Sequence, residues 1–134
     1  MDRGSVHLLL RAILAGPAGL RQWRALHTRQ GCSRPAMIDA FQSEQVREIG
    51  REVVAHCQTR TIESEFPIEL GDDLYSLYGF TIGDIADTVS SICDKCGVTR
   101  PSGAQLSDAC VRTVNDLIQF IAAGCPSPGD TAAM

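Results

Sequence analysis

The chain has 134 residues, enough for one domain with extensions, and its aromatic content of 5% indicates a small aliphatic core. Its net charge of −4 is divided unevenly, because residues 1–36 carry six arginines and one acid whereas residues 37–134 carry six bases and fifteen acids. The acidity of residues 37–134 argues against nucleic acid as a ligand of that part, because phosphate repels carboxylate.

Residues 1–36 have the composition of a mitochondrial presequence, rich in arginine and almost free of acids. One helical face can collect aliphatic side chains beside two arginines: Leu8, Leu9, Leu10, Ile13 and Leu14, with Arg3 and Arg11. The apolar run is too short to cross a membrane and is interrupted by Arg11 and Pro17. We therefore expect a transit peptide or, alternatively, a basic N-terminal arm that lies on a partner.

The first helix of the body is predicted over residues 39–57, where Asp39 and Gln42 have the spacing of a capping box. Apolar residues then recur at helical spacing to form its inner face: Val46, Ile49, Val53, Val54 and Cys57. Residues 58–80 lack a clean period and contain Pro67, Gly71 and Gly79. A loop that packs on the domain is expected there, with a short helical turn over residues 72–78.

Local signals mark both ends of a second helix, over residues 82–96. Thr81 is a good N-cap, Asp84 can reach back to it, and Gly97 is the expected left-handed terminator. A stripe of apolar residues is expected to face the core: Ile85, Val89, Ile92 and Cys96.

Two further helices are predicted, a short one within residues 102–110 and a last one that Thr113 caps and that ends before Gly124. No stretch alternates with period two for long enough to be a strand. The predicted fold class is therefore all-α, with three longer helices and a short one in a domain of residues 37–123. Residues 124–134 are expected to form a flexible C-terminal tail.

Several segments together resemble the acyl carrier proteins, over roughly residues 40–122. SEQVREIGREVVA resembles the opening helix of that family, and FPIELGDD resembles its approach to the second helix. ICDKCGVTRP followed by TVNDLIQFI is similar to the end of the second helix, the turn, and the last helix. The resemblance implies a small acyl-carrier-like helical bundle with N- and C-terminal arms.

The chain departs from this family at the prosthetic group. Active carriers begin the second helix with Asp-Ser-Leu, and the serine takes the 4′-phosphopantetheine arm. Counting back from Pro101 puts Ile82 at the serine position, whereas alignment on ELGDDL puts Leu74 there. Neither side chain has a hydroxyl, so no cofactor and no catalytic residue are expected. Ser76 is the nearest serine and is the attachment site in the alternative prediction of an active mitochondrial carrier.

The resemblance also implies a docking surface. In the family the acidic second helix meets basic partners, including the Leu-Tyr-Arg-motif proteins of mitochondrial complexes. Asp84, Asp87 and Asp94 are the candidates for such partner binding, and an ordinary solvated face is the alternative.

Cysteines raise a separate possibility. Cys93 and Cys96 have the spacing of a zinc hook, with Cys110 and Cys125 as further ligands, but the second pair is far apart in the sequence. Buried reduced thiols are the favoured interpretation, and no metal is expected.

These features together predict a non-catalytic accessory subunit of a respiratory-chain complex, part of the electron-transport apparatus. It would lie in the mitochondrial matrix or on the matrix side of the inner membrane, bind other protein subunits, and have no transmembrane segment of its own. A subunit of the ATP synthase or of the mitoribosome is the alternative setting.

Overall fold

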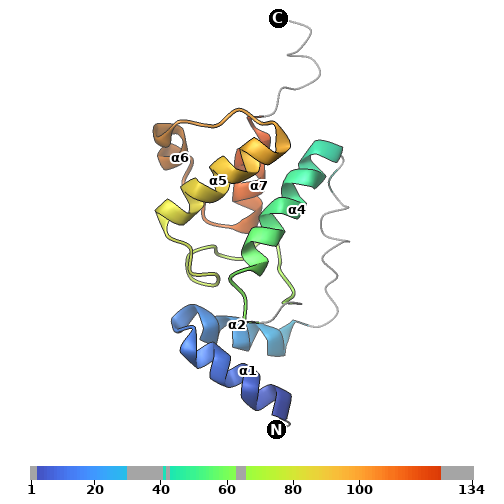
Figure 1. Cartoon of the computed structure of the whole chain (residues 1–134), viewed down its shortest axis with the longest axis vertical. Coiled ribbons are helices and arrows are strands. Elements are labelled where there is room, and N and C mark those ends of the chain that lie inside the picture. Colours follow the sequence, from blue (N-terminus) through green and yellow to red (C-terminus); the bar gives the residue numbers. More distant parts are fainter. Residues whose placement is uncertain (1–2, 30–40, 42, 63–65, 125–134) are drawn as a thin grey trace, which may run out of the picture.

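A computed structural model describes residues 3–29, 41, 43–62 and 66–124 (Figure 1). These ranges contain six helices and no strand, so the predicted all-α class is confirmed for them. The helices are α1 (Arg3–Leu14), α2 (Pro17–Thr28), α4 (Glu44–Gln58), α5 (Ile82–Cys96), α6 (Gly103–Ala109) and α7 (Val114–Ala122). The predicted tail from residue 125 onward and the segment 30–40 lie outside the described residues.

The core lies between α4, α5 and α7, each of which turns one aliphatic face inward. Residues at helical spacing supply it: Ile49, Val53 and Cys57 from α4; Ile85, Val89 and Ile92 from α5; Val114, Leu117, Ile118 and Ile121 from α7. Full burial of one such aliphatic side chain contributes about 1.5–3 kcal/mol. Cys93 is also buried, whereas Cys96, predicted for the inner stripe, is half-buried at its edge.

Four of the helices have a serine or a threonine as their N-cap residue. Ser43, Thr81, Ser102 and Thr113 each accept a hydrogen bond from the backbone N–H three residues on, and α5, α6 and α7 have complete capping boxes. The predicted caps at Thr81 and Thr113 are therefore confirmed. The predicted cap at Asp39 and Gln42 lies outside the described residues. In the described part of the chain this helix, α4, begins at Glu44, directly after its N-cap Ser43.

The second helix of the prediction also ends as expected. Gly97 has a φ of 70°, in the left-handed region that favours glycine, and the Val98 N–H donates to the Cys93 carbonyl at 2.8 Å. Val98 is buried behind this turn. The chain is thereby redirected toward α6.

The described part of the loop between α4 and α5 packs against the domain, as predicted. Phe66, Ile68, Leu74 and Tyr78 are buried in the core cluster, and residues 74–78 form consecutive turns. Backbone hydrogen bonds join the loop to the start of α7: Leu74 N–H to the Arg112 carbonyl at 2.7 Å, Val114 N–H to Asp72, and Asn115 N–H to Leu70. The loop therefore has a fixed position relative to α7.

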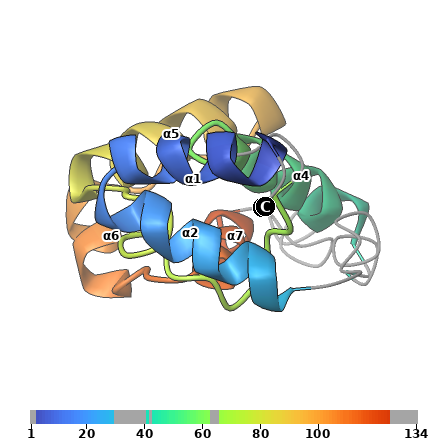
Figure 2. The same ribbon diagram turned by 90° about the horizontal axis from the view of Figure 1, so that it is seen from below.

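The helices α1 and α2 form a hairpin, which lies across one end of the body formed by α4–α7 (Figures 1 and 2). The two helices approach closely at Gly19, where an added Cβ would lie 2.4 Å from the Ala12 carbonyl oxygen. This hairpin is built from the segment predicted as a presequence or basic arm. Whether the segment is removed stays a prediction.

Candidate functional site

The start of α5 is the position at which the resemblance implies a prosthetic group. Ile82 is the first residue of α5 and its side chain is 72% exposed. The neighbouring Thr81 is engaged as the cap, since its hydroxyl oxygen accepts the Asp84 N–H at 3.1 Å and its own N–H donates to the Asp84 carboxylate at 2.9 Å. When the chain is instead aligned on ELGDDL, the serine position falls on Leu74, which is fully buried in the core.

Ser76, the alternative attachment residue, lies in the turn before α5 and not at the start of a helix. Its backbone N–H donates to Asp73 Oδ1 at 2.9 Å, and its carbonyl accepts from Arg21 Nη1 at 3.0 Å. Although partial burial opposes the shift, hydrogen bonds from Ser76 and Tyr75 lower the pKa of Asp73. Ser76 is thus held by both its own turn and α2.

An apolar pocket of about 240 Å³ opens beside Ile82, between α5 and α6. Aliphatic side chains and small residues form most of its wall: Tyr75, Ile82, Ile85, Ala86, Gly103, Leu106, Ser107, Cys110 and Val111. Its volume is below the usual 300–1,000 Å³ of small-molecule sites. An aliphatic side chain or a short hydrocarbon segment matches its size and its chemistry.

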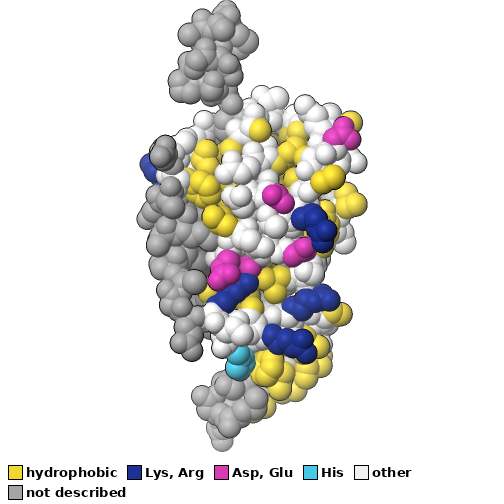
Figure 3. Space-filling view, turned by 180° about the vertical axis from the view of Figure 1, so that it is seen from behind, with side chains coloured by type: hydrophobic (Ala, Val, Ile, Leu, Met, Phe, Trp, Pro, Cys, Tyr) yellow, Lys and Arg dark blue, Asp and Glu magenta, His cyan; other side chains and the backbone are white. Residues whose placement is uncertain are grey.

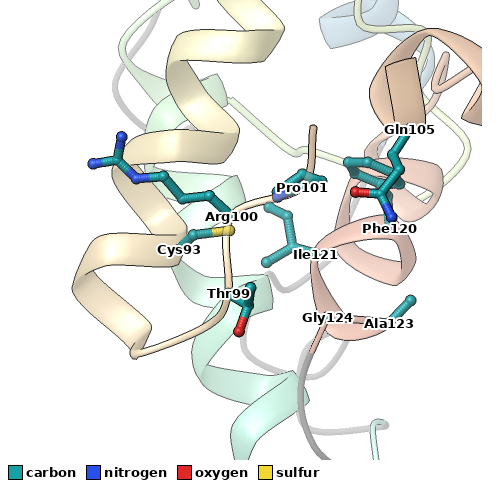
Figure 4. Close-up of a pocket in the computed structure, with 9 residues that line it drawn as sticks. All are labelled: Cys93, Thr99, Arg100, Pro101, Gln105, Phe120, Ile121, Ala123 and Gly124. Atoms are coloured by element: carbon teal, nitrogen blue, oxygen red, sulfur yellow. The ribbon is translucent and has the colours of Figure 1, made fainter. Parts of the chain in front are cut away.

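A second pocket, of about 320 Å³, lies where α5, the following turn and the end of α7 meet (Figure 4). Its described lining is Cys93, Thr99, Arg100, Pro101, Gln105, Phe120, Ile121, Ala123 and Gly124. The Arg100 guanidinium points away from Ile121 and binds Asp94. The described lining of both pockets lacks His, Asp and Glu.

The three predicted partner-binding acids differ in their surroundings. Asp84 caps α5 and also contacts Arg60 at 3.3 Å, and the hydrogen bonds from Thr81 lower its pKa. Asp94 accepts from the Arg100 Nε at 2.8 Å, and this hydrogen bond lowers the Asp94 pKa. Asp87 is exposed and forms no ion pair within the described residues. Asp87 is therefore the acid of α5 most accessible to a basic partner.

The structure describes four of the cysteines, and they differ in burial. Cys57 and Cys93 are buried, Cys96 is half-buried and Cys110 is exposed, while Cys125 lies outside the described residues. No group of three or more His, Cys, Asp or Glu side chains in the described part of the chain is placed to hold a metal ion. Burial and the charge of Asp72 raise the pKa of Cys57 to about 12.

A buried polar cluster joins α2 to the body, and sequence reasoning missed it. The side-chain amide of fully buried Gln22 donates to the carbonyls of Leu77 and Arg60 at 2.8 and 2.9 Å, and its oxygen accepts from the Ile62 N–H at 2.7 Å. Three of its hydrogen-bonding positions are thus filled by the body's backbone.

A second part of this cluster is centred on Asp72. The Arg29 guanidinium and the Tyr78 hydroxyl both donate to the Asp72 carboxylate, and the Glu69 N–H donates at 2.8 Å. Burial alone would lower the pKa of Arg29, but the hydrogen bond to Asp72 and the charge of Asp72 raise it above its usual value. Burial and the same carboxylate also raise the pKa of Tyr78, so the phenol stays protonated.

Comparison of the chain with protein-family models, curated proteins and solved structures found no match. The likeness to acyl carrier proteins therefore rests on the motifs and helix order of this chain. As for membranes, none of the helices in the described ranges has both the length and the apolar character needed to cross a bilayer.

Proposed function

We propose that this chain is a non-catalytic accessory subunit of a mitochondrial respiratory-chain complex, with an acyl-carrier-like body that lacks a prosthetic group and acts by binding other proteins. The observation that carries the proposal is Ile82, an exposed side chain without a hydroxyl at the first position of α5. A phosphodiester needs an oxygen at this position, which isoleucine does not have.

Two further features support binding as the mode of action. Ile82 stands exposed at the mouth of the apolar pocket, so both are available to an apolar side chain of a partner. Asp87 is exposed on the same helix, where a basic partner could reach it.

The arginine-rich first 36 residues support a mitochondrial location.

The absence of the prosthetic group is tested by intact mass spectrometry after co-expression with a phosphopantetheinyl transferase. We expect the full chain to keep its unmodified mass while an active carrier protein, treated in parallel, gains the adduct. An adduct that disappears in the Ser76→Ala variant would overturn the proposal and establish the alternative of an active carrier.

The partner is tested by affinity purification of the tagged chain from mitochondria. We expect respiratory-chain subunits to co-purify, and we expect Asp87→Asn to weaken their recovery more than Asp108→Asn, a matched change of an exposed acid on α6. Recovery of ATP synthase or mitoribosomal proteins instead would assign the chain to that assembly, and the proposed binding role would stand.

A further inference from the structure

The outer face of α1 is apolar. Val6, Leu10, Ile13 and Leu14 follow one another at i, i+4, i+7 and i+8, so they share one side of the helix. All four are exposed, Leu10 and Ile13 to 54% and Leu14 to 87%. We call these four residues the α1 stripe. Five of the six large hydrophobic side chains exposed within the described residues belong to α1 and α2, the fifth being Leu20.

The packing of α1 explains why the stripe is left outside. The contact with α2 uses small residues, since Ala12 is fully buried and its carbonyl lies against Gly19. A helix that meets its neighbour through Ala and Gly and leaves four of its six large aliphatic side chains exposed resembles a helix in lipid more than one on a soluble core. The stripe thus has no partner within the described chain.

The charge around the stripe identifies what would cover it. Residues 3–29 contain five arginines and no acid, and Arg11, Arg21 and Arg24 are exposed. Figure 3 shows apolar side chains gathered at the end of the molecule where α1 and α2 lie, with Lys or Arg side chains bordering them. The acids are concentrated in the remainder of the chain, so the molecule is cationic at one end.

We propose that the α1 stripe lies in the headgroup region of an anionic lipid bilayer, with the exposed Arg11 and Arg24 of the hairpin binding lipid phosphate. The helix has 12 residues, a length of about 18 Å, which suits a position parallel to the surface. A second copy of the chain fits less well, because pairing two stripes would bring two cationic ends together. The acidic body would face away from the anionic surface.

The test uses the full chain and flotation with vesicles of phosphatidylcholine, alone or with about 30% phosphatidylglycerol. We expect binding at least about tenfold stronger with the anionic lipid, and weaker at high salt. The triple variant Leu10→Ser/Ile13→Ser/Leu14→Ser should bind at least about 100-fold less, because its apolar contact is lost.

Controls distinguish this binding from non-specific hydrophobic adsorption and from the effects of unfolding. Ile82→Ser removes an aliphatic side chain of α5 whose exposure, 72%, lies between those of Ile13 and Leu14, and should leave vesicle binding unchanged. If the triple variant loses its helical circular dichroism signal, the single variant Leu14→Ser replaces it in the test. We expect this single change to weaken vesicle binding about fivefold.

Several results would overturn the proposal. They are the absence of vesicle binding by the unaltered chain, equal binding to both vesicle types, and unchanged binding by the stripe variants. Self-association of the unaltered chain that the triple variant abolishes, with no vesicle binding, would assign the stripe to a second copy. Each outcome is independent of whether the chain carries a prosthetic group.

Discussion

The Arg29 guanidinium contacts both carboxylate oxygens of Asp72 and thereby connects the end of α2 to the loop before α5. Arg29 also donates to the Pro67 carbonyl at 2.8 Å and lies over the Phe66 ring. Because Asp72 is almost fully buried, loss of the Arg29 guanidinium would leave its carboxylate without a cation. The position of the N-terminal hairpin and the stability of the body are therefore coupled.

The first prediction concerns this pair. Arg29→Ala should lower the free energy of unfolding by about 3 kcal/mol, because it leaves a buried carboxylate without its cation. Urea unfolding followed by circular dichroism measures the loss. Arg51→Ala, which removes an exposed contact with Glu44, should leave the free energy of unfolding almost unchanged. Equal stability of the two variants would contradict a docked hairpin.

The second prediction concerns Gln22. Gln22→Leu should cost about 2–4 kcal/mol, because the carbonyls of Arg60 and Leu77 and the N–H of Ile62 lose their partner. Gln119→Leu makes the same change on an exposed part of α7 and should be close to neutral. Thermal unfolding of both variants checks this, and similar midpoints would show that the amide is not buried in solution.

The third prediction concerns the contact of α1 with α2. Gly19→Ala should destabilise the hairpin by about 1–3 kcal/mol, because the new methyl group would meet the Ala12 carbonyl. Gly103→Ala should stabilise by about 0.5 kcal/mol, since nothing lies within 4 Å of an added Cβ there. Trp23 lies in α2, so its fluorescence reports hairpin unfolding directly. A neutral Gly19→Ala would mean that the helices are further apart.

The fourth prediction concerns acid. The pKa of Asp73 is lowered in the folded chain, so this group stabilises the fold above the pKa of the unfolded state, about 3.9, and the contribution disappears as the pH falls through the lower folded value. Asp73→Asn should therefore be less stable than the unaltered chain by about 1 kcal/mol at pH 7 and equally stable near pH 2. Urea titrations at both pH values measure the difference. A difference that is the same at both would assign the effect to packing.

The fifth prediction concerns thiol reactivity. A maleimide pulse at pH 7 should modify exposed Cys110 within minutes and leave Cys57 unmodified, because Cys57 is buried and its pKa is about 12. Peptide mass mapping locates the label, and a pulse in denaturant gives the reference in which both react. Equal native labelling would contradict the burial of Cys57 in the core.

Helix ends were the part of the fold that the sequence could predict. Thr81, Asp84 and Gly97 act within one turn of the backbone they cap, so their effect can be recognised from neighbouring residues alone. The same holds for Thr113 and the start of α7. The place of Ile82 as the first residue of α5 followed from these local signals, since the cap determines which residue comes first in the helix.

The docking of α2 could not be predicted in this way. Gln22 binds backbone groups 38 to 55 residues further along the chain, and a backbone carbonyl has no sequence signature. Arg29 and Asp72 are likewise 43 residues apart, and neither stands in a motif. The pairing of Asp94 with Arg100 was missed because it depends on the direction the chain takes after Gly97.

The buried position of Gln22 and Arg29 affects how the protein should be produced for study. A recombinant chain that starts at residue 37 would omit both residues and leave the Asp72 carboxylate with Tyr78 and Glu69 as its neighbours. We expect such a fragment to be less stable than the full chain, because its buried carboxylate has lost the cation. Expression should therefore begin at Met1, so that Gln22 and Arg29 are retained.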